Sequence, residues 1–327
     1  QRQMCIRDRF FTITIESNEI VKKSITFLGM LITSFCVFLK FGLFFENGVS
    51  SYFTQKLLLD EFSLFGNVLI SLILLFNFLP IWDSSKQLKE KTTEAIILTL
   101  MSASGFMLMV DSENLIMLFI GLEIGSISLY ALAGLNRGDK LSNEASLKYF
   151  LLGSLASCIL IYGVSLVYVS FSVFSVYNFA LGIAYVGPDS VPLTTSIGVL
   201  LIFIGLLFKI AAAPFQSWAP DVYQGSPTGY VGFMSSIAKV SSFIVIARLC
   251  LVSINFIIED FNIFFLIVII SSALIGSLFA SIQEDLKRLL AYSGVVQSGF
   301  ILSGIVSGIN GTSASMFYLF TYILQLI

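Results

Sequence analysis

The sequence predicts an all-α polytopic membrane protein, a bundle of helices that cross a bilayer. Of its 327 residues, 57% are hydrophobic and 12% are charged, and the mean hydropathy is +0.93. Soluble domains carry about 25% charged residues. Long apolar stretches also follow one another along the chain, separated by short polar connectors. At roughly 20 residues per crossing, the chain has room for about ten membrane helices.

The apolar stretches give the expected helices in order. They cover residues 24–45, 62–82, 94–111, 114–134, 145–170, 194–214, 226–250, 261–282, 287–308 and 312–327. The region 94–134 is expected to divide into one short helix and one full one. Residues 1–23 are polar and lack the apolar stretch of a secretory signal, and residues 1–9 resemble a non-native extension. The sequence stops within the last stretch, which indicates a fragment or one piece of a split protein.

The composition excludes several classes of function. There is no histidine, which removes imidazole ligation of haem or zinc, serine–histidine catalysis and the usual proton shuttle near neutral pH. The net charge of −2 gives no electrostatic basis for binding nucleic acid. The four cysteines, Cys5, Cys36, Cys158 and Cys250, are scattered and form no CxxC pair. We expect isolated buried thiols rather than metal ligands or a disulfide framework.

Basic residues predict one orientation in the membrane. They collect in the connectors 83–93, 135–144 and 283–288 and in the N-terminal segment, all on the same predicted side. The other side has little beyond Lys56 and Arg248. By the positive-inside rule, the basic side faces the cytoplasm or a mitochondrial matrix.

Three charged residues lie in the middle of apolar stretches: Glu123, Lys209 and Lys239. A charge at a helix centre costs about 2.5–3.5 kcal/mol on insertion scales, and a glutamate there is too short to reach the interface. These residues are therefore predicted to be functional. Lys40 and Lys148 lie near the ends of their stretches, where a lysine usually extends to the interface. Lys148 is only a possible member of the site.

Polar side chains accompany the intramembrane charges at helical spacing. The candidate channel-lining residues are Ser126 and Tyr130 on the Glu123 stretch, Ser235, Ser236 and Ser242 around Lys239, and Pro214 and Gln216 after Lys209. Pro214 frees the carbonyl of Ile210, which predicts a broken helix near Lys209–Pro214. A break at membrane depth is tolerated where it lines a cavity. If Glu123 and Lys209 lay within about 8 Å, their coupling of roughly 2 kcal/mol would load or unload a proton on Lys209.

Four stretches together resemble a known family. FKIAAAPFQSWAPDVYQGSPTGYVGFMSSIAKV (208–240) closely resembles the signature of the antiporter-like subunits of respiratory complex I. The stretches GLEIGSISLYALAG (121–134), NEASLKYFLLGSLASCILIYG (143–163) and EDLKRLLAYSGVVQSG (284–299) agree in order and spacing. The form PDVYQGSPT (220–228) resembles one branch of that family.

The resemblance implies an antiporter-like fold with two inverted five-helix repeats. Residues 24–93 would form N-terminal membrane helices, 94–250 a complete first repeat and 251–327 the start of a truncated second repeat. Glu123, Lys209 and Lys239 match the family's proton-translocating residues, and Lys148 matches a further lysine. Gln216 and Gln297 stand where the family commonly has histidine. Because a glutamine cannot carry a proton at neutral pH, a relay role at these two positions is in doubt.

The expected function is proton translocation in the membrane arm of respiratory complex I, coupled to electron transfer from NADH to ubiquinone. The resemblance implies no cofactor in this chain, with flavin and iron–sulfur clusters in partner subunits. Expected partners are other membrane-arm subunits, neighbouring antiporter-like subunits among them, phospholipid, and a separate chain supplying the missing C-terminal repeat. Two alternatives stay open: a cation/proton antiporter subunit outside the respiratory chain, and a structural subunit with a lost channel. Thirty-two phenylalanines suggest an AT-rich organelle genome, so the mitochondrial inner membrane is expected before a thylakoid or bacterial plasma membrane.

Overall fold

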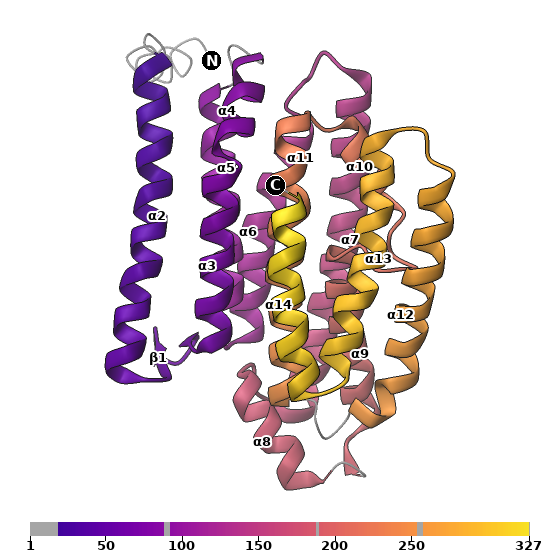
Figure 1. The fold of residues 1–327 in the computed structure, drawn as a ribbon. Helices are drawn as coiled ribbons and strands as arrows, with labels where there is room; N and C mark the ends of the chain where they lie inside the picture. The colour runs from indigo at the N-terminus through magenta and orange to yellow at the C-terminus, as the bar shows by residue number, and fades with distance from the viewer. Residues whose placement is uncertain (1–18, 88–91, 188–189, 254–257, 327) are drawn as a thin grey trace, which may run out of the picture.

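The computed structural model of the chain describes residues 19–87, 92–187, 190–253 and 258–326. They form a bundle of helices that lie roughly side by side (Figure 1). Within these ranges, seven helices are long and apolar enough to cross a membrane, and an eighth span results if the bent pair α3 and α4 counts as one. The predicted membrane bundle is thereby confirmed. Most of the polar segment 1–23, including Cys5, lies outside the described residues.

Each predicted apolar stretch coincides with helix. The helices are α2 (Glu19–Asn47), α3 (Glu61–Phe76) with α4 (Phe78–Gln87), α5 (Thr92–Asp111), α6 (Leu115–Ala133), α7 (Lys140–Phe171), α9 (Leu193–Lys209), α11 (Thr228–Arg248), α12 (Ile258–Ser281), α13 (Leu286–Val306) and α14 (Ile309–Leu326). The region 94–134 forms two helices of similar length rather than one short and one full, because Asn114 caps a second helix. The stretch 62–82 is bent by 45° between α3 and α4.

Five short elements were not predicted. A small antiparallel hairpin, β1 (Ser50–Tyr52) with β2 (Leu57–Leu59), follows α2 and is the one departure from the all-α prediction in the described residues. The short helices α8 (Val176–Val186) and α10 (Trp218–Gly225) and the π-helical turn η3 (Leu249–Ser253) complete the chain. Each is too short to give a clear apolar period in the sequence.

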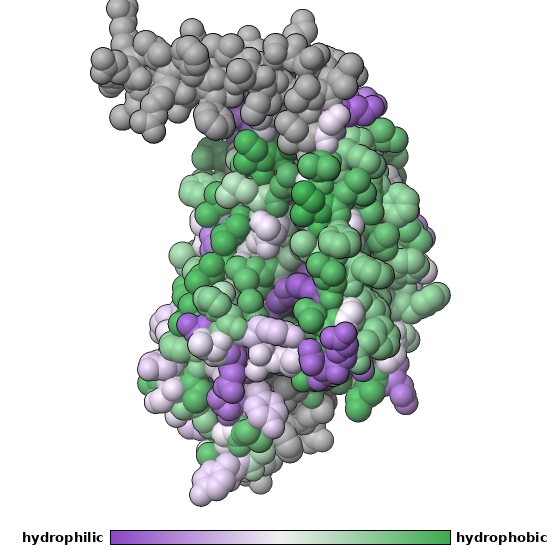
Figure 2. Space-filling view, turned by 90° about the vertical axis from the view of Figure 1, so that its left-hand side faces the viewer, coloured by the Kyte–Doolittle hydropathy of each residue, from purple (hydrophilic) through white to green (hydrophobic). Residues whose placement is uncertain are grey.

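Helix α11 forms the centre of the bundle, since 94% of its most apolar window is buried. The outer helices α2 and α12 are 11% and 22% buried over the same length. Figure 2, which views the α2 side, shows mostly hydrophobic residues over the upper and middle parts and hydrophilic ones gathered lower down. An apolar outer surface around a buried helix suits a lipid environment.

The cysteine prediction is only partly correct. Cys36, Cys158 and Cys250 are free thiols, as expected. However, Cys36 and Cys158 are exposed, and only Cys250 is buried. The two exposed thiols lie on outward faces of α2 and α7, where the apolar surface of a membrane protein accepts a small hydrophobic side chain.

The basic connectors share one end of the bundle, as predicted. Ser84, Asn136, Asp139 and Lys287, which come from three different connectors, line one surface pocket. The Ser84 Oγ also accepts a hydrogen bond of 3.0 Å from the Gly229 backbone N–H at the start of α11. We refer to this as the basic end.

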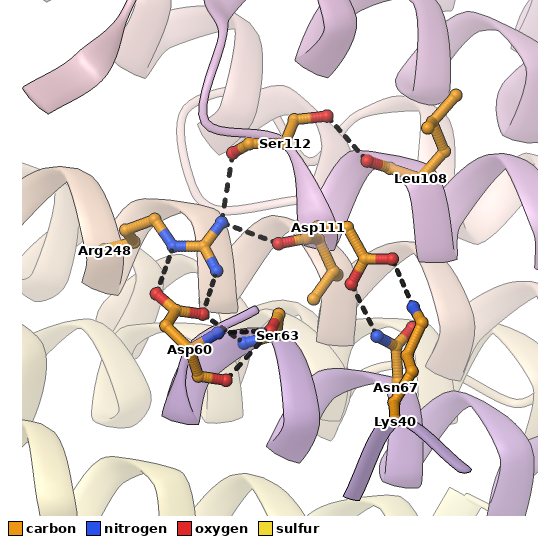
Figure 3. Close-up of polar contacts among 9 residues, drawn as sticks. Lys40, Asp60, Ser63, Asn67, Leu108, Asp111, Ser112 and Arg248 are labelled. Carbon is orange, nitrogen blue, oxygen red and sulfur yellow. Dashed lines mark hydrogen bonds and ion pairs between the residues drawn. The ribbon is translucent and has the colours of Figure 1, made fainter. Parts of the chain in front are cut away.

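At the opposite end, Arg248 ties α11 to α3 and α5 (Figure 3). Its guanidinium donates to both carboxylate oxygens of Asp60, at 2.5 and 3.1 Å. It also donates to the carbonyl oxygens of Val110, at 2.6 Å, and Ser112, at 3.1 Å. Asp60 in turn caps α3 by accepting from the Ser63 N–H at 2.7 Å. A buried arginine is tolerated here because its donors meet such partners.

Beside this cluster, Lys40 forms an ion pair with Asp111 (Figure 3). Asp111 also accepts a hydrogen bond of 2.6 Å from the Asn67 side chain. The expectation for Lys40 did not include this partner, a carboxylate at the end of α5.

Candidate functional site

Lys209 is the last residue of α9, and its side chain is 3% exposed. Its Nζ donates hydrogen bonds to the Ser126 Oγ, at 3.0 Å, and to the Tyr130 Oη, at 2.9 Å. The same Nζ lies 5.5 Å from the centre of the Tyr130 ring. Two of the predicted polar residues of α6 therefore meet the predicted lysine of α9.

The helix is interrupted directly after Lys209, as predicted. The carbonyl of Ile210, which Pro214 deprives of a helical partner, accepts a hydrogen bond of 2.9 Å from the Ser298 Oγ of α13. The backbone N–H of Ala213 donates to the Ser272 Oγ of α12 at 2.9 Å. Pro214 itself is exposed. Two neighbouring helices thus replace the hydrogen bonds that the break removes.

Glu123 lies one turn before Ser126 on α6 and is half-buried. It is not a hydrogen-bonding partner of Lys209, which is bound to Ser126 and Tyr130 instead. The carboxylate still interacts electrostatically with both Lys209 and Tyr130. Its Oε1 is buried without a hydrogen-bond partner in the protein. The structure therefore brings Glu123 within electrostatic range of Lys209 without an ion pair.

Lys239 lies in the middle of α11 and is 2% exposed. Its Nζ donates to the Gly294 carbonyl oxygen of α13, at 2.8 Å, and to the Tyr322 Oη of α14, at 3.0 Å. The Nζ lies 5.2 Å from the centre of the Tyr322 ring. Both buried lysines thus have a phenol as a partner, and neither contacts a carboxylate.

The three serines near Lys239 differ in their surroundings. Ser235 lines a cavity of about 240 Å³ together with Tyr223 and Tyr322. Ser236 donates to the Gly232 carbonyl at 2.7 Å within its own helix. Ser242 is buried, and its Oγ has no hydrogen-bond partner in the protein. Of the three, Ser235 is the one that reaches the cavity.

Lys148 is not part of the Lys209 cluster. It forms ion pairs with Asp221 at 2.7 Å and with Glu144 at 2.8 Å, and its side chain is 41% exposed. Asp221 also pairs with Arg288 at 2.7 Å, so the three residues join α7, α10 and α13 at the basic end. Burial raises the pKa of Asp221, but the hydrogen bonds from Lys148 and Arg288 outweigh it and hold the pKa below its usual value.

Gln216 and Gln297 stand at the two positions where the family commonly has histidine. Both lie apart from the groups that bind Lys209 and Lys239. Gln216 is half-buried in the break, and its Oε1 is buried without a hydrogen-bond partner in the protein. Gln297 accepts a hydrogen bond from the Tyr318 hydroxyl on α14. Neither glutamine contacts Lys209 or Lys239.

Sequence reasoning missed the partners of Lys239, namely Gly294 and Tyr322, and the ion-pair role of Asp221. Tyr322 is one of several hydroxyl-bearing residues of α14, so the sequence does not single it out. Gly294 contributes a backbone oxygen, which no side-chain pattern reveals. Asp221 stands inside the PDVYQGSPT motif, where its charge could have been matched with the basic residues of the same membrane side.

A family model and individual relatives both connect this chain to NADH:quinone oxidoreductases. Residues 112–326 match the family described as NADH:quinone oxidoreductase/Mrp antiporter, TM. NADH-quinone oxidoreductase subunit N of Trichlorobacter lovleyi is 38% identical over 276 residues, which cover 83% of this chain and 56% of that protein. The protein of the same name from Flavobacterium psychrophilum is 34% identical over 298 residues, covering 91% of this chain and 64% of that protein. The chain thus spans about three-fifths of the length of these curated relatives.

Solved structures share the fold. A chain of respiratory complex I from Thermus thermophilus with bound aureothin superposes with a TM-score of 0.75 and 26% identity, covering 97% of this chain and 67% of that one. A chain of the Mrp complex from Dietzia sp. DQ12-45-1b gives a TM-score of 0.82 at 19% identity, covering 98% of this chain and 60% of that one, which supports the fold alone. These comparisons confirm the family resemblance found in residues 208–240 and in the three other stretches. The family branch that PDVYQGSPT resembles is the one whose members are named subunit N.

Proposed function

Because the chain belongs to the NADH:quinone oxidoreductase/Mrp antiporter transmembrane family, we propose that it is a proton-translocating membrane-arm subunit of an NADH:quinone oxidoreductase. One observation carries the proposal. Lys209 and Lys239 are buried in the helix bundle, 3% and 2% exposed, and each is held by neutral oxygen atoms rather than a carboxylate. Ionisable side chains buried at membrane depth are costly, and they mark proton and ion pathways in membrane proteins.

In this proposal, Glu123 controls whether Lys209 carries a proton. Redox chemistry elsewhere in the complex changes the distance between Glu123 and Lys209. At about 8 Å and an effective dielectric near 20, the attraction is roughly 2 kcal/mol, which changes proton occupancy by about thirtyfold. Moving the carboxylate away then sends the proton of Lys209 toward Lys239. Lys148 has no step in this scheme, because Asp221 and Glu144 hold it at the basic end.

The same proposed function also predicts the repeats of this chain, its partners and its membrane. Residues 94–250, which include α5, α6, α7, α9 with α10, and α11, form the first five-helix repeat, and 251–327 begin the second.

The chain holds no redox group, and flavin and iron–sulfur clusters belong to partner subunits. Its partners are other membrane-arm subunits and phospholipid. The relatives described above are bacterial, so we place it in a plasma membrane rather than in a mitochondrial inner membrane.

The test is the variant Lys209→Met, which keeps the length of the side chain and removes the charge. Lys140→Met, at an exposed lysine at the start of α7, is the matched control. Assembly is verified on a native gel, and NADH oxidation and proton pumping are then measured together in membranes. Loss of both activities in the Lys209 variant alone is expected. Normal pumping by an assembled Lys209→Met complex would overturn the proposal and favour a structural subunit with a lost channel.

A cation/proton antiporter subunit outside the respiratory chain is the second candidate, since the Mrp complex has the same fold. Purification of the assembled complex separates the two. Flavin and iron–sulfur subunits copurifying with this chain support the oxidoreductase. A complex without redox subunits that exchanges Na⁺ for protons supports the antiporter.

A further inference from the structure

Tyr130, the phenol that binds Lys209, lies against one face of helix α7. Four residues of α7 surround it, and we refer to them as the Tyr130 cradle. They are Ser146, Tyr149, Phe150 and Gly153. Their spacing of three, four and seven residues places all four on the same side of the helix. Helix α7 does not bind Lys209 directly, but it borders the group that does.

The first three members of the cradle hold the backbone and the ring of Tyr130. The Ser146 hydroxyl donates a hydrogen bond of 2.8 Å to the Tyr130 carbonyl oxygen. The Tyr149 ring meets the Tyr130 ring edge to face, with centroids 4.7 Å apart, and Phe150 meets it in the same way at 5.9 Å. Contacts of this kind favour one side-chain rotamer over the others. They therefore set the direction in which the phenol points.

The fourth member, Gly153, makes room for the Tyr130 hydroxyl. A Cβ at position 153 would lie 2.7 Å from the Tyr130 Cζ and would overlap the hydroxyl oxygen itself. Because glycine has no side chain, the hydroxyl fits against the backbone of α7 and still accepts the 2.9 Å hydrogen bond from the Lys209 Nζ. Any larger residue at position 153 would force the hydroxyl to move.

Trp218 connects the cradle to the chain beside Lys209. The Tyr149 ring stacks on the Trp218 ring, with centroids 4.7 Å apart and an interplanar angle of 7°. The Trp218 Nε1 donates a hydrogen bond of 3.0 Å to the carbonyl oxygen of Phe208, the residue before Lys209. The Tyr149 ring therefore contacts both the phenol that binds the ammonium group and the indole that holds the neighbouring backbone.

We propose that the Tyr130 cradle positions the ammonium group of Lys209. The proposal rests on the proposed function and assigns positioning residues to it. The cradle acts through Tyr130, because the hydrogen bonds of the Lys209 Nζ go to Tyr130 and Ser126. If the phenol turned to another rotamer, Ser126 alone would hold the ammonium group. Proton transfer requires donor and acceptor within hydrogen-bonding reach, so a small displacement of this group slows it strongly.

The test uses Gly153→Ala in the assembled complex in membranes, after assembly has been verified on a native gel. The added methyl group displaces the Tyr130 hydroxyl, and proton pumping should fall by about 10- to 100-fold, as expected for a misplacement of about 1 Å. Gly182→Ala on α8 is the matched control. Its added Cβ would lie 2.7 Å from the Phe171 ring, a similar clash outside the cradle. The control should pump normally.

Two substitutions at position 149 test the same role without adding a clash, and they keep the proposal testable if Gly153→Ala does not assemble. Tyr149→Leu removes the ring that contacts Tyr130 and Trp218, so it should reproduce the loss of pumping. Tyr149→Phe keeps that ring and should retain at least half of the parent's pumping. An equal loss in both variants would overturn the proposal, because the hydroxyl rather than the ring would then matter.

The pH dependence of pumping separates positioning from a general loss of packing. A hydrogen bond to an ammonium group changes its proton affinity. The pH of half-maximal pumping should therefore shift by about half a unit or more in Gly153→Ala and Tyr149→Leu, and it should stay unchanged in Gly182→Ala. Glu123, the carboxylate within electrostatic range of Lys209, is the same in all these variants. A lower rate with the parent's pH profile would overturn the proposal.

The variant Lys209→Met distinguishes failure of the cradle from failure of the proposed function. If Gly153→Ala and Tyr149→Leu both assemble and pump normally while Lys209→Met does not, the cradle has no positioning role and the proposed function stands. If Lys209→Met also pumps normally, the proposed function fails, and the role of the cradle fails with it.

Discussion

The Nζ of Lys239 lies 2.8 Å from the carbonyl oxygen of Gly294, on the neighbouring helix α13. This approach depends on the absence of a side chain at position 294. A Cβ there would lie 2.5 Å from the Nζ and 2.8 Å from the Tyr322 Oη, both closer than nonbonded atoms come. Glycine therefore lets a backbone oxygen and a phenol hold the ammonium in place of a carboxylate.

The variant Gly294→Ala should displace the Lys239 ammonium from this site. A displacement of about 1 Å at a reacting group costs up to about 100-fold in rate, so we expect proton pumping to fall by about 10- to 100-fold. Gly299→Ala on the same helix is the control, because its added Cβ would come no closer than 3.1 Å to a neighbour. Pumping is measured after assembly has been verified on a native gel. Equal activity of the two variants would contradict this role of Gly294.

The variant Ser298→Ala tests how the broken helix is stabilised. It removes the hydrogen bond of 2.9 Å to the Ile210 carbonyl and leaves that buried oxygen without this donor. The expected loss is about 1–3 kcal/mol, the usual cost of such a buried polar group. Thermal unfolding of the purified protein in detergent measures it. Ser303→Ala is the control, because Ser303 is exposed and its hydroxyl forms a hydrogen bond within its own helix. Unchanged stability in Ser298→Ala would show that the broken helix does not need the Ser298 hydroxyl.

The order of helices and the break could be predicted because both depend on local sequence. Apolar length locates a span, and Pro214 removes a helical hydrogen bond wherever the helix packs. The charges Glu123, Lys209 and Lys239 stood out because intramembrane ionisable residues are costly. The meeting of Lys209 with Ser126 and Tyr130 was only half predicted: the polar stripe was identified on α6, but its contact depends on how α6 and α9 pack.

The partners of Lys239 could not be predicted, because they come from α13 and α14, which lie more than fifty residues later in the chain. Lys40 shows the same limit. Its position near a helix end favoured the interface, yet Asp111, seventy-one residues away, forms its ion pair. Contacts between distant helices follow from tertiary packing, and a single sequence carries little information about it.

The variant Arg248→Lys should destabilise the end of the bundle opposite the basic end. Lysine cannot reproduce the two-pronged contact with Asp60 and the bonds to the carbonyls of Val110 and Ser112 together. Breaking a buried ion pair typically costs about 3–5 kcal/mol, and a lysine that keeps one contact should lose somewhat less. Thermal unfolding in detergent measures the change. Arg137→Lys, at an exposed connector position, should leave the midpoint unchanged, and an equally small effect at Arg248 would show that the cluster is dispensable.

Asp221 should make the stability of the basic end depend on pH. Burial raises its pKa, but the hydrogen bonds from Lys148 and Arg288 hold the pKa below the usual value. A lowered carboxyl pKa contributes stability above the unfolded value of about 3.9 and loses that contribution as the pH falls through the folded value. Because Asp221 is one-third exposed, we expect Asp221→Asn to cost about 1 kcal/mol at pH 7. The difference in unfolding midpoint between the variant and the parent should stay constant from pH 8 to about 5 and shrink below about pH 4. Glu46→Gln, at an exposed carboxylate on α2, is the control, and a difference for Asp221→Asn that grew as the pH fell would contradict the ion-pair role of Asp221.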